Sequence, residues 1–348
     1  MSAYFSHKSR PKPKFGLERL RWDMRPSRAS GRPELVEGRA RSRPGLVAAI
    51  AALLVCGWPS GPVAQDQTRS QLPREDRPFT SGVEITSVTA TVTDKEGHLV
   101  TGLGRDAFEV YEDGERQTVT QFTNERVPIG LGVLLDISDS MFGKRIRDAR
   151  AAVDRFLFTL LDESDEFFLA AFNHKPRPLT TWTRGHDEIA VALDALRPSG
   201  GTAIYDAIID SLPLIDRRSR QRGAILVISD GADTASSSNA RDVQAALWRS
   251  DAFVYAIAID SPEPQAINTR VNPQTLREIT NESGGRTEIV RTSADLDDAT
   301  ARIAEELNSQ YVLGYTSPRG ADGKYHSIRV RMHGAEYKVR ARNGYVAK

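Results

Sequence analysis

Three short polar motifs in the middle of the sequence carry side-chain oxygens of the kind that bind a cation. The first, Asp136-Ile137-Ser138-Asp139-Ser140, follows an almost continuously apolar run, and so does the third, Ser229-Asp230-Gly231. The second is Ser199-Gly200-Gly201-Thr202. The candidate ligands are two carboxylates and three hydroxyls, without His or Cys: Asp136, Ser138, Ser140, Thr202 and Asp230. A ligand set made only of oxygen atoms favours a hard cation. Because the set includes only two carboxylates, it suits Mg²⁺ or Mn²⁺ better than Ca²⁺.

Four apolar runs predict the strands that would position these motifs. They cover residues 129–137, 167–172, 224–228 and 253–259. Strands of this kind are buried on both faces, as in parallel sheets. Amphipathic segments with helical spacing separate the runs, and Ser293 can cap a further helix. The predicted fold class is α/β, with an open, mostly parallel sheet over residues 128–307 that carries helices on both faces.

In an open α/β sheet, ligands bind outside the carboxyl ends of the strands, so the three motifs would meet at one edge. Asp206 lies one turn after Thr202 and is expected to brace that loop. Asp139 and Asp233 are expected to be solvated residues at the rim. The basic cluster at 217–222 is expected to form a solvated loop, and the six histidines, which lack metal-binding spacing, to lie at surfaces or turns.

The segments on either side of the α/β region have a different pattern. Residues 81–127 and 308–348 contain short alternating runs joined by Gly-containing turns, which is typical of β-strands. Each segment is too small to bury the face of a sheet by itself. We therefore expect the two segments to pair into one small β-domain into which the α/β region is inserted.

The polar motifs resemble a known metal site. Asp136-x-Ser138-x-Ser140, followed by Thr202 and Asp230, is similar to the metal-ion-dependent adhesion site of von Willebrand factor type A (VWA) domains, which have a Rossmann-like sheet. The resemblance covers residues 128–307, and the flanking segments look like a bacterial exported subgroup called VWFA-related. It implies that the serines bind the metal directly, the threonine directly or through water, and the aspartates mostly through water.

The predicted function is therefore that of an exported protein-binding or adhesion module rather than an enzyme. An Asp or Glu carboxylate of a protein partner would complete the coordination of the Mg²⁺ or Mn²⁺. A metal-stiffened scaffold or assembly subunit of the cell envelope is the alternative. A metal-dependent hydrolase is less favoured because no general base accompanies the ligands. The net charge of +1 argues against a nucleic-acid partner.

The N-terminal region predicts export. Residues 1–45 hold twelve Lys and Arg against four Asp and Glu, a local charge of +8, so the rest of the chain carries −7. Residues 46–64 continue with a short apolar core and an exit rich in small residues, as in a signal peptide. Residues 65–80 are expected to be a linker, and the mature protein to be periplasmic, secreted or on the cell surface. Translation could start at Met1 or at Met24.

Cys56 is the single cysteine, which excludes a disulfide framework. Leu53-Leu54-Val55-Cys56 resembles a bacterial lipobox, although Val55 departs from the small residue that the pattern prefers. Cleavage after Ala64 and lipid attachment at Cys56 are both open at this point. Contact with a membrane is expected only through such a lipid anchor or through an uncleaved signal segment, because the apolar core is shorter than the ~20 residues of a spanning helix.

Overall fold

The computed structural model describes residues 85–230, 232–260, 273–334 and 336–348. The basic leader (1–45), the export segment with Cys56 (46–64) and the linker (65–80) lie outside the described residues, so their expected roles stay predictions. Among the described residues, no helix is both long and apolar enough to span a membrane.

The α/β region is built on a six-stranded sheet with the order β10-β9-β8-β5-β6-β7. Neighbouring strands are parallel except β7, which is antiparallel to β6 at one edge. The strands are β5 (Ile129–Asp136), β6 (Glu166–Phe172), β7 (Pro176–Pro178), β8 (Arg222–Ser229), β9 (Phe253–Ile259) and β10 (Thr287–Val290). All residues of β5, β8 and β9 are buried, which confirms the prediction of strands covered on both faces.

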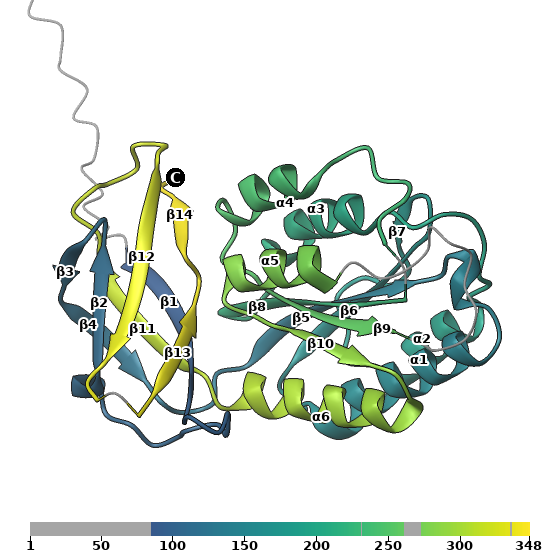
Figure 1. Cartoon of the computed structure of the whole chain (residues 1–348), viewed down its shortest axis with the longest axis horizontal. Coiled ribbons are helices and arrows are strands. Elements are labelled where there is room, and N and C mark those ends of the chain that lie inside the picture. Colours follow the sequence, from purple (N-terminus) through teal and green to yellow (C-terminus); the bar gives the residue numbers. More distant parts are fainter. Residues whose placement is uncertain (1–84, 231, 261–272, 335) are drawn as a thin grey trace, which may run out of the picture. The chain divides into compact units, whose positions relative to one another are not determined.

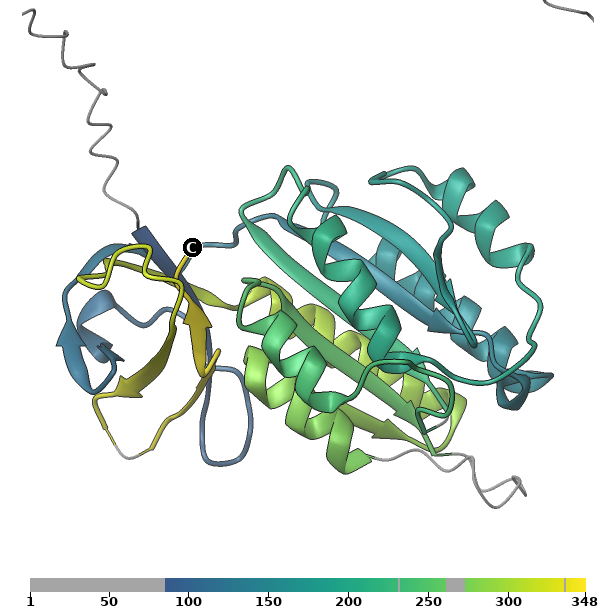
Figure 2. The same cartoon turned by 90° about the horizontal axis from the view of Figure 1, so that it is seen from above.

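Helices cover both faces of this sheet, as predicted (Figures 1 and 2). The apolar faces of α1, α2 and α6 pack in one core, and those of α3, α4 and α5 pack in the other. The helices are α1 (Lys144–Arg155), α2 (His186–Asp194), α3 (Ile204–Ile215), α4 (Ala240–Leu247), α5 (Pro273–Ser283) and α6 (Ser293–Asn308), and one π-helical turn, Phe156–Leu160, extends α1. Successive residues of β5 face opposite cores, so Val133 and Leu135 contribute to the first and Leu134 to the second.

The N-terminal cap of α6 differs from the prediction. Thr292, not Ser293, caps the helix: its hydroxyl accepts a hydrogen bond from the Asp295 N–H at 3.1 Å. The Asp295 carboxylate in turn accepts the Thr292 N–H at 3.0 Å, which completes a capping box. The reciprocal pair holds Thr292 in an extended conformation, and Ser293 becomes the first helical residue.

The two flanking segments pair with each other, as expected. β1 is antiparallel to both β11 and β13, and β12 is antiparallel to β2. Two four-stranded sheets result, with the orders β13-β1-β11-β4 and β14-β12-β2-β3. Their strands are β1 (Ile85–Thr93), β2 (Phe108–Glu112), β3 (Glu115–Gln117), β4 (Val119–Thr123), β11 (Tyr311–Thr316), β12 (Tyr325–Met332), β13 (Lys338–Ala341) and β14 (Gly344–Val346). They share one core that includes Val88, Val110 and Leu313.

Buried polar groups join the flanking strands to the α/β region. Glu306 of α6 is fully buried and accepts hydrogen bonds from Thr91 Oγ1 at 3.2 Å and from the Tyr255 hydroxyl at 2.9 Å. Its carboxylate also forms ion pairs with Arg340 at 2.6 Å and Arg286 at 3.3 Å. Residues from β1, β9, α6 and β13 therefore meet at one carboxylate.

Two expectations of solvated side chains were wrong. Arg222 of the basic cluster is buried, and its guanidinium donates to the carbonyl oxygens of Val127 and Leu307, each at 2.9 Å. Burial lowers its pKa to about 10. His326 is also buried, between the carboxylates of Asp113 and Asp322, at 2.8 and 3.0 Å. Both side chains are accommodated because most of their polar groups find partners: Nη1 and Nη2 of Arg222 donate to protein oxygens, although its Nε has no hydrogen-bond partner among the described residues, and both ring nitrogens of His326 face a carboxylate.

Candidate functional site

The candidate site lies where β5 and β8 end side by side. These strands are parallel neighbours, with Leu135 opposite Ile228, so Asp136 and Asp230 emerge at the same edge of the sheet. The Ser140 hydroxyl donates to Asp230 Oδ1 at 2.7 Å, and the Ser138 and Ser140 hydroxyl oxygens are 3.0 Å apart. Four of the five predicted residues therefore form one connected group.

The loop after β5 is shaped by its own side chains. Asp136 Oδ1 accepts the Ser138 N–H at 2.7 Å, a local turn that Asp favours. A short 3₁₀ turn, Asp139–Met141, follows, and the Ser140 hydroxyl within it reaches Asp230. Met141 is fully buried and anchors the loop to the core. The spacing D-x-S-x-S therefore corresponds to two consecutive turns, the first at Asp136 and the second over Asp139–Met141.

Thr202 lies on an adjoining loop at the same edge. The Ser199 N–H donates to the Ile137 carbonyl at 2.7 Å, and the Asp139 N–H donates to the Gly200 carbonyl at 2.9 Å. Gly200 has a φ of +79°, a conformation that favours glycine, and a Cβ there would lie 3.0 Å from His174 Nδ1. Thr202 is buried, and its N–H donates to Thr234 Oγ1 at 3.0 Å. The structure brings its loop, rather than its hydroxyl, into direct contact with the serine-containing turn.

Burial dominates the electrostatics of the two carboxylates. Asp136 and Asp230 are both fully inaccessible to solvent. Burial raises the pKa of Asp136 to about 7, although hydrogen bonds from Ser229 and Ser138 act in the opposite direction. Burial also raises the pKa of Asp230, against the hydrogen bond from Ser140 and the charge of Arg145. Two neighbouring buried carboxylates are costly to ionise, and a cation between them would relieve that cost.

One oxygen of this group is incompletely satisfied. Asp230 Oδ2 is buried and accepts no hydrogen bond from the described residues; its partner is Arg145, whose Nη1 lies 3.4 Å away. The same Nη1 donates to the Ser140 carbonyl at 2.7 Å. A buried, weakly paired carboxylate oxygen beside two hydroxyls fits a hard cation such as Mg²⁺. The described residues contain no cluster of three or more His, Cys, Asp and Glu side chains able to hold a metal, so any site here depends on hydroxyls.

The other rim aspartates have structural roles. Asp206 accepts hydrogen bonds from the N–H groups of Ser237 at 2.8 Å and Ser238 at 3.0 Å, so it braces the loop before α4 and not, as expected from the sequence, the Thr202 loop. Asp233 is half-buried and accepts the Tyr205 N–H at 3.0 Å in the first turn of α3. The expectation that Asp233 is a solvated rim residue was therefore wrong, whereas Asp139 is exposed.

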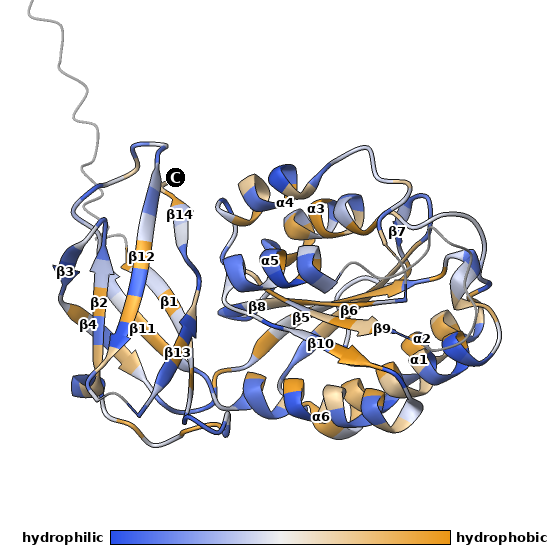
Figure 3. Cartoon of the chain, in the orientation of Figure 1, coloured by the Kyte–Doolittle hydropathy of each residue, from blue (hydrophilic) through white to orange (hydrophobic). Residues whose placement is uncertain are grey.

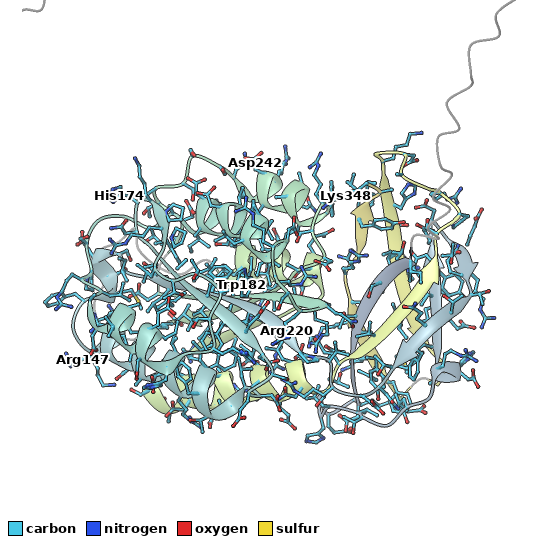
Figure 4. The ribbon with its side chains drawn as sticks, turned by 180° about the vertical axis from the view of Figure 1, so that it is seen from behind. Arg147, His174, Trp182, Arg220, Asp242 and Lys348 are labelled. Atoms are coloured by element: carbon cyan, nitrogen blue, oxygen red, sulfur yellow. The ribbon has the colours of Figure 1, made fainter. Side chains whose placement is uncertain are left out.

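Three residues at this edge were not predicted from the sequence as part of the site. Ser229 donates its hydroxyl hydrogen to Asp136 Oδ2 at 2.5 Å, and its position directly before Asp230 was an available signal. Arg145 belongs to α1, and no local pattern connects it with Asp230. His174 projects from the loop that follows β6 and is labelled in Figure 4.

A parallel sheet with an all-oxygen rim at its strand ends defines an open α/β protein of the Rossmann-like class. Residues 131–232 match the family model of the von Willebrand factor type A domain. The matched region is therefore a VWA domain, and it spans most of β5, all of β6, β7 and β8, and the loops of the candidate site. No curated protein sequence matches the chain.

Solved structures with a similar fold are distant in sequence. A conserved hypothetical protein, BatB from Bacteroides thetaiotaomicron, is 21% identical over 51% of this chain and 98% of its own, with a TM-score of 0.44. The vWF domain of the type V pili tip protein Mfa5 from Porphyromonas gingivalis is 14% identical over 53% and 96%, with a TM-score of 0.41. A von Willebrand factor type A protein from Catenulispora acidiphila is 13% identical over 77% and 75%, with a TM-score of 0.45.

Proposed function

We propose that the VWA domain is a metal-dependent protein-binding module of an exported protein. The observation that supports this most directly is the group formed by Asp136, Ser138, Ser140 and Asp230. In this group, a buried oxygen of Asp230 has no partner among the described residues other than a long ion pair. These four residues, with Thr202, would hold Mg²⁺ or Mn²⁺. The ion would supply a positive charge with an open position for an acidic side chain of the partner protein.

The chain's own residues prepare the site for that role. Asp136 orients the turn through the Ser138 N–H, and Ser229 fixes the other carboxylate oxygen of Asp136. Ser140 is held towards Asp230, so the hydroxyls and carboxylates converge before any ligand arrives. With only two carboxylates, the protein would leave a divalent cation short of anionic ligands, and a carboxylate from a partner would be attracted.

A metal titration tests this proposal. We expect Mg²⁺ or Mn²⁺ to bind the wild-type protein in calorimetry and Asp136→Ala to abolish the heat. Asp139→Ala is the matched control, because Asp139 lies in the same loop but is exposed. Circular dichroism would check that each variant is folded, and Asp230→Asn would replace Asp136→Ala if the latter unfolds. Equal heats for wild type and Asp136→Ala would refute the proposal.

A structural role for the metal is the second candidate. The hydrogen bonds Ser229–Asp136 and Ser140–Asp230 already link the ends of β5 and β8, and a cation there would stiffen that link. Capture of partners from an envelope extract, with and without chelator, separates the two functions. Loss of capture on chelation favours a binding module. Unchanged capture with a lowered melting temperature favours a scaffold.

A further inference from the structure

A second cleft, remote in sequence from the metal motifs, lies in the β-strand region. It has a volume of about 540 Å³ and is lined by residues of β12, of β2 and the turn that follows it, and of β13 and the chain that follows it. Its described lining contains three arginines and no acidic residue. The polar residues of the lining are Tyr111, Ser327, Arg329, Arg331, Arg342 and Asn343.

The alternation of β12 directs two of these arginines outward. The strand has the pattern of exposed and buried residues expected when one face packs on a core, with Ile328 and Val330 inward and Arg329 and Arg331 outward. Figure 3 shows the same alternation of hydrophilic and hydrophobic residues along β12. The charged face of the strand is therefore fixed by the core beneath it.

The guanidinium groups of the two β12 arginines are incompletely neutralised. Within the described part of the chain, neither Arg329 nor Arg331 forms an ion pair; Arg331 lies over the Tyr111 ring, 4.9 Å from its centre. The Arg342 guanidinium is engaged outside this lining: it donates to the Ser87 carbonyl at 2.9 Å, lies over the Tyr345 ring at 5.2 Å from its centre, and has Asp251 as a charge partner that opposes the lowering of its pKa by burial. Like charges gathered at one cleft repel each other unless an anion is present.

The acidic groups beside the cleft are already engaged with other cations. Glu109, opposite Arg331 across the strand pair, forms an ion pair with Arg116 at 3.1 Å and accepts the Tyr111 hydroxyl at 3.0 Å. Asp113 holds His326 at 2.8 Å and Arg319 at 3.5 Å. The fold therefore leaves the positive charge of the cleft available to a ligand.

We propose that this cleft binds a compact polyanion, a ligand that carries two or more phosphate or carboxylate groups. Planar guanidinium groups match such oxyanions with paired hydrogen bonds. Ser327 and Asn343 add polar groups at the edge of the cleft. The proposal does not depend on the metal site, because none of the lining residues belongs to the polar motifs.

Calorimetric titration of the full chain in metal-free buffer tests this site. The probes are tripolyphosphate and citrate, which distinguish a phosphate source from a carboxylate source. We expect at least one of them to bind the wild-type protein, and the double substitution Arg329→Gln with Arg331→Gln to weaken that binding at least tenfold. Arg302→Gln is the matched control, since Arg302 is a surface arginine already paired with Glu288 at 2.9 Å.

The outcomes separate this site from the metal site. Asp136→Ala should bind the anion as the wild type does, because it alters only the metal motif. Failure of both probes to bind the wild type, or equal affinity in the double Gln variant, would overturn the proposal. If the double Gln variant does not fold, the double Lys variant keeps the charge but loses the guanidinium geometry, and it should still bind several-fold more weakly than the wild type.

Discussion

Ser140 donates its hydroxyl hydrogen to Asp230 Oδ1 over 2.7 Å, although the two residues are 90 positions apart in the sequence. The bond joins the turn after β5 to the end of β8 and closes the group of oxygens at the edge of the sheet. It also fixes which oxygen of Asp230 is engaged, so that Oδ2 is left to the longer contact with Arg145.

Replacing Ser140 tests whether its hydroxyl acts as a ligand. Ser140→Ala should weaken Mg²⁺ binding by about tenfold or more, roughly 1.4 kcal/mol, because one oxygen is lost and Asp230 is no longer oriented. Calorimetric titration measures the change. Ser219→Ala is the control: Ser219 also bonds a carboxylate, Glu166 at 2.7 Å, but it lies before the first residue of β8, whereas Ser140 lies after the last residue of β5. Unchanged affinity in Ser140→Ala would exclude the ligand role.

The buried carboxylate of Glu306 should make a large contribution to stability, because it joins the flanking strands to the α/β region. Glu306→Ala leaves Arg340 and Arg286 without their shared partner, and we expect a loss of about 2–4 kcal/mol in the free energy of unfolding. The expected loss is smaller than the loss for a wholly buried ion pair, because both arginines keep some contact with water. Urea denaturation measures it.

The neighbouring residue supplies the control for that substitution. Glu305 is on the same helix but exposed, so Glu305→Ala should change the free energy of unfolding by less than about 0.5 kcal/mol. Similar losses for Glu305→Ala and Glu306→Ala would show that the buried network does not carry the stability assigned to it.

Gly132 is required by the packing of β5 on β6. A Cβ at this position would lie 2.5 Å from the Phe168 ring, which is itself in edge contact with Trp182, labelled in Figure 4. Gly132→Ala should therefore destabilise the protein by about 1–3 kcal/mol through overpacking. Gly104→Ala, which meets no atom within 4 Å, should be close to neutral in the same denaturation experiment. A neutral Gly132→Ala would mean that Phe168 can move aside.

His326 should make stability depend on pH. The hydrogen bond to Asp113, and then that to Asp322, raise the pKa of His326 above 6.5. Its stabilising contribution is therefore present below pH 6.5 and is lost as the pH rises through the folded-state pKa. The pKa values of Asp113 and Asp322 are lowered from 3.8, mainly by His326, so their contributions are lost on acidification instead. Arg319 near Asp113, Lys324 near Asp322 and Tyr345 beside the ring are further ionisable groups around this cluster.

Melting temperatures between pH 6 and pH 9 measure this dependence. The wild type should lose stability over this range, and His326→Gln should lose less. His174→Gln, which alters an exposed histidine, should keep the wild-type pH profile. Parallel profiles for the wild type and His326→Gln would contradict the assignment.

The sequence by itself determined the four central strands of the α/β sheet and the edge of the sheet at which the polar motifs lie. The apolar runs that became β5, β8 and β9 are long enough to require burial on both faces, and this defines a parallel sheet. In such a sheet the strands end at a common edge, so Asp136 and Asp230 had to lie near each other. The pairing of the two flanking segments followed from the inability of either to bury a sheet face alone.

Only the tertiary structure decided which polar side chains meet within that framework. Arg145 contacts Asp230, and Glu306 contacts both Thr91 and Arg340. His326 lies between two carboxylates. These contacts form because packing brings segments that are distant in the sequence together. The same holds for the arginine-lined cleft, where residues of β12 and those after β13 meet. The periodicity of a sequence reveals which face of a helix or strand is buried. It does not reveal which charged side chain of another element that face will contact, and these contacts determine the chemistry of both sites.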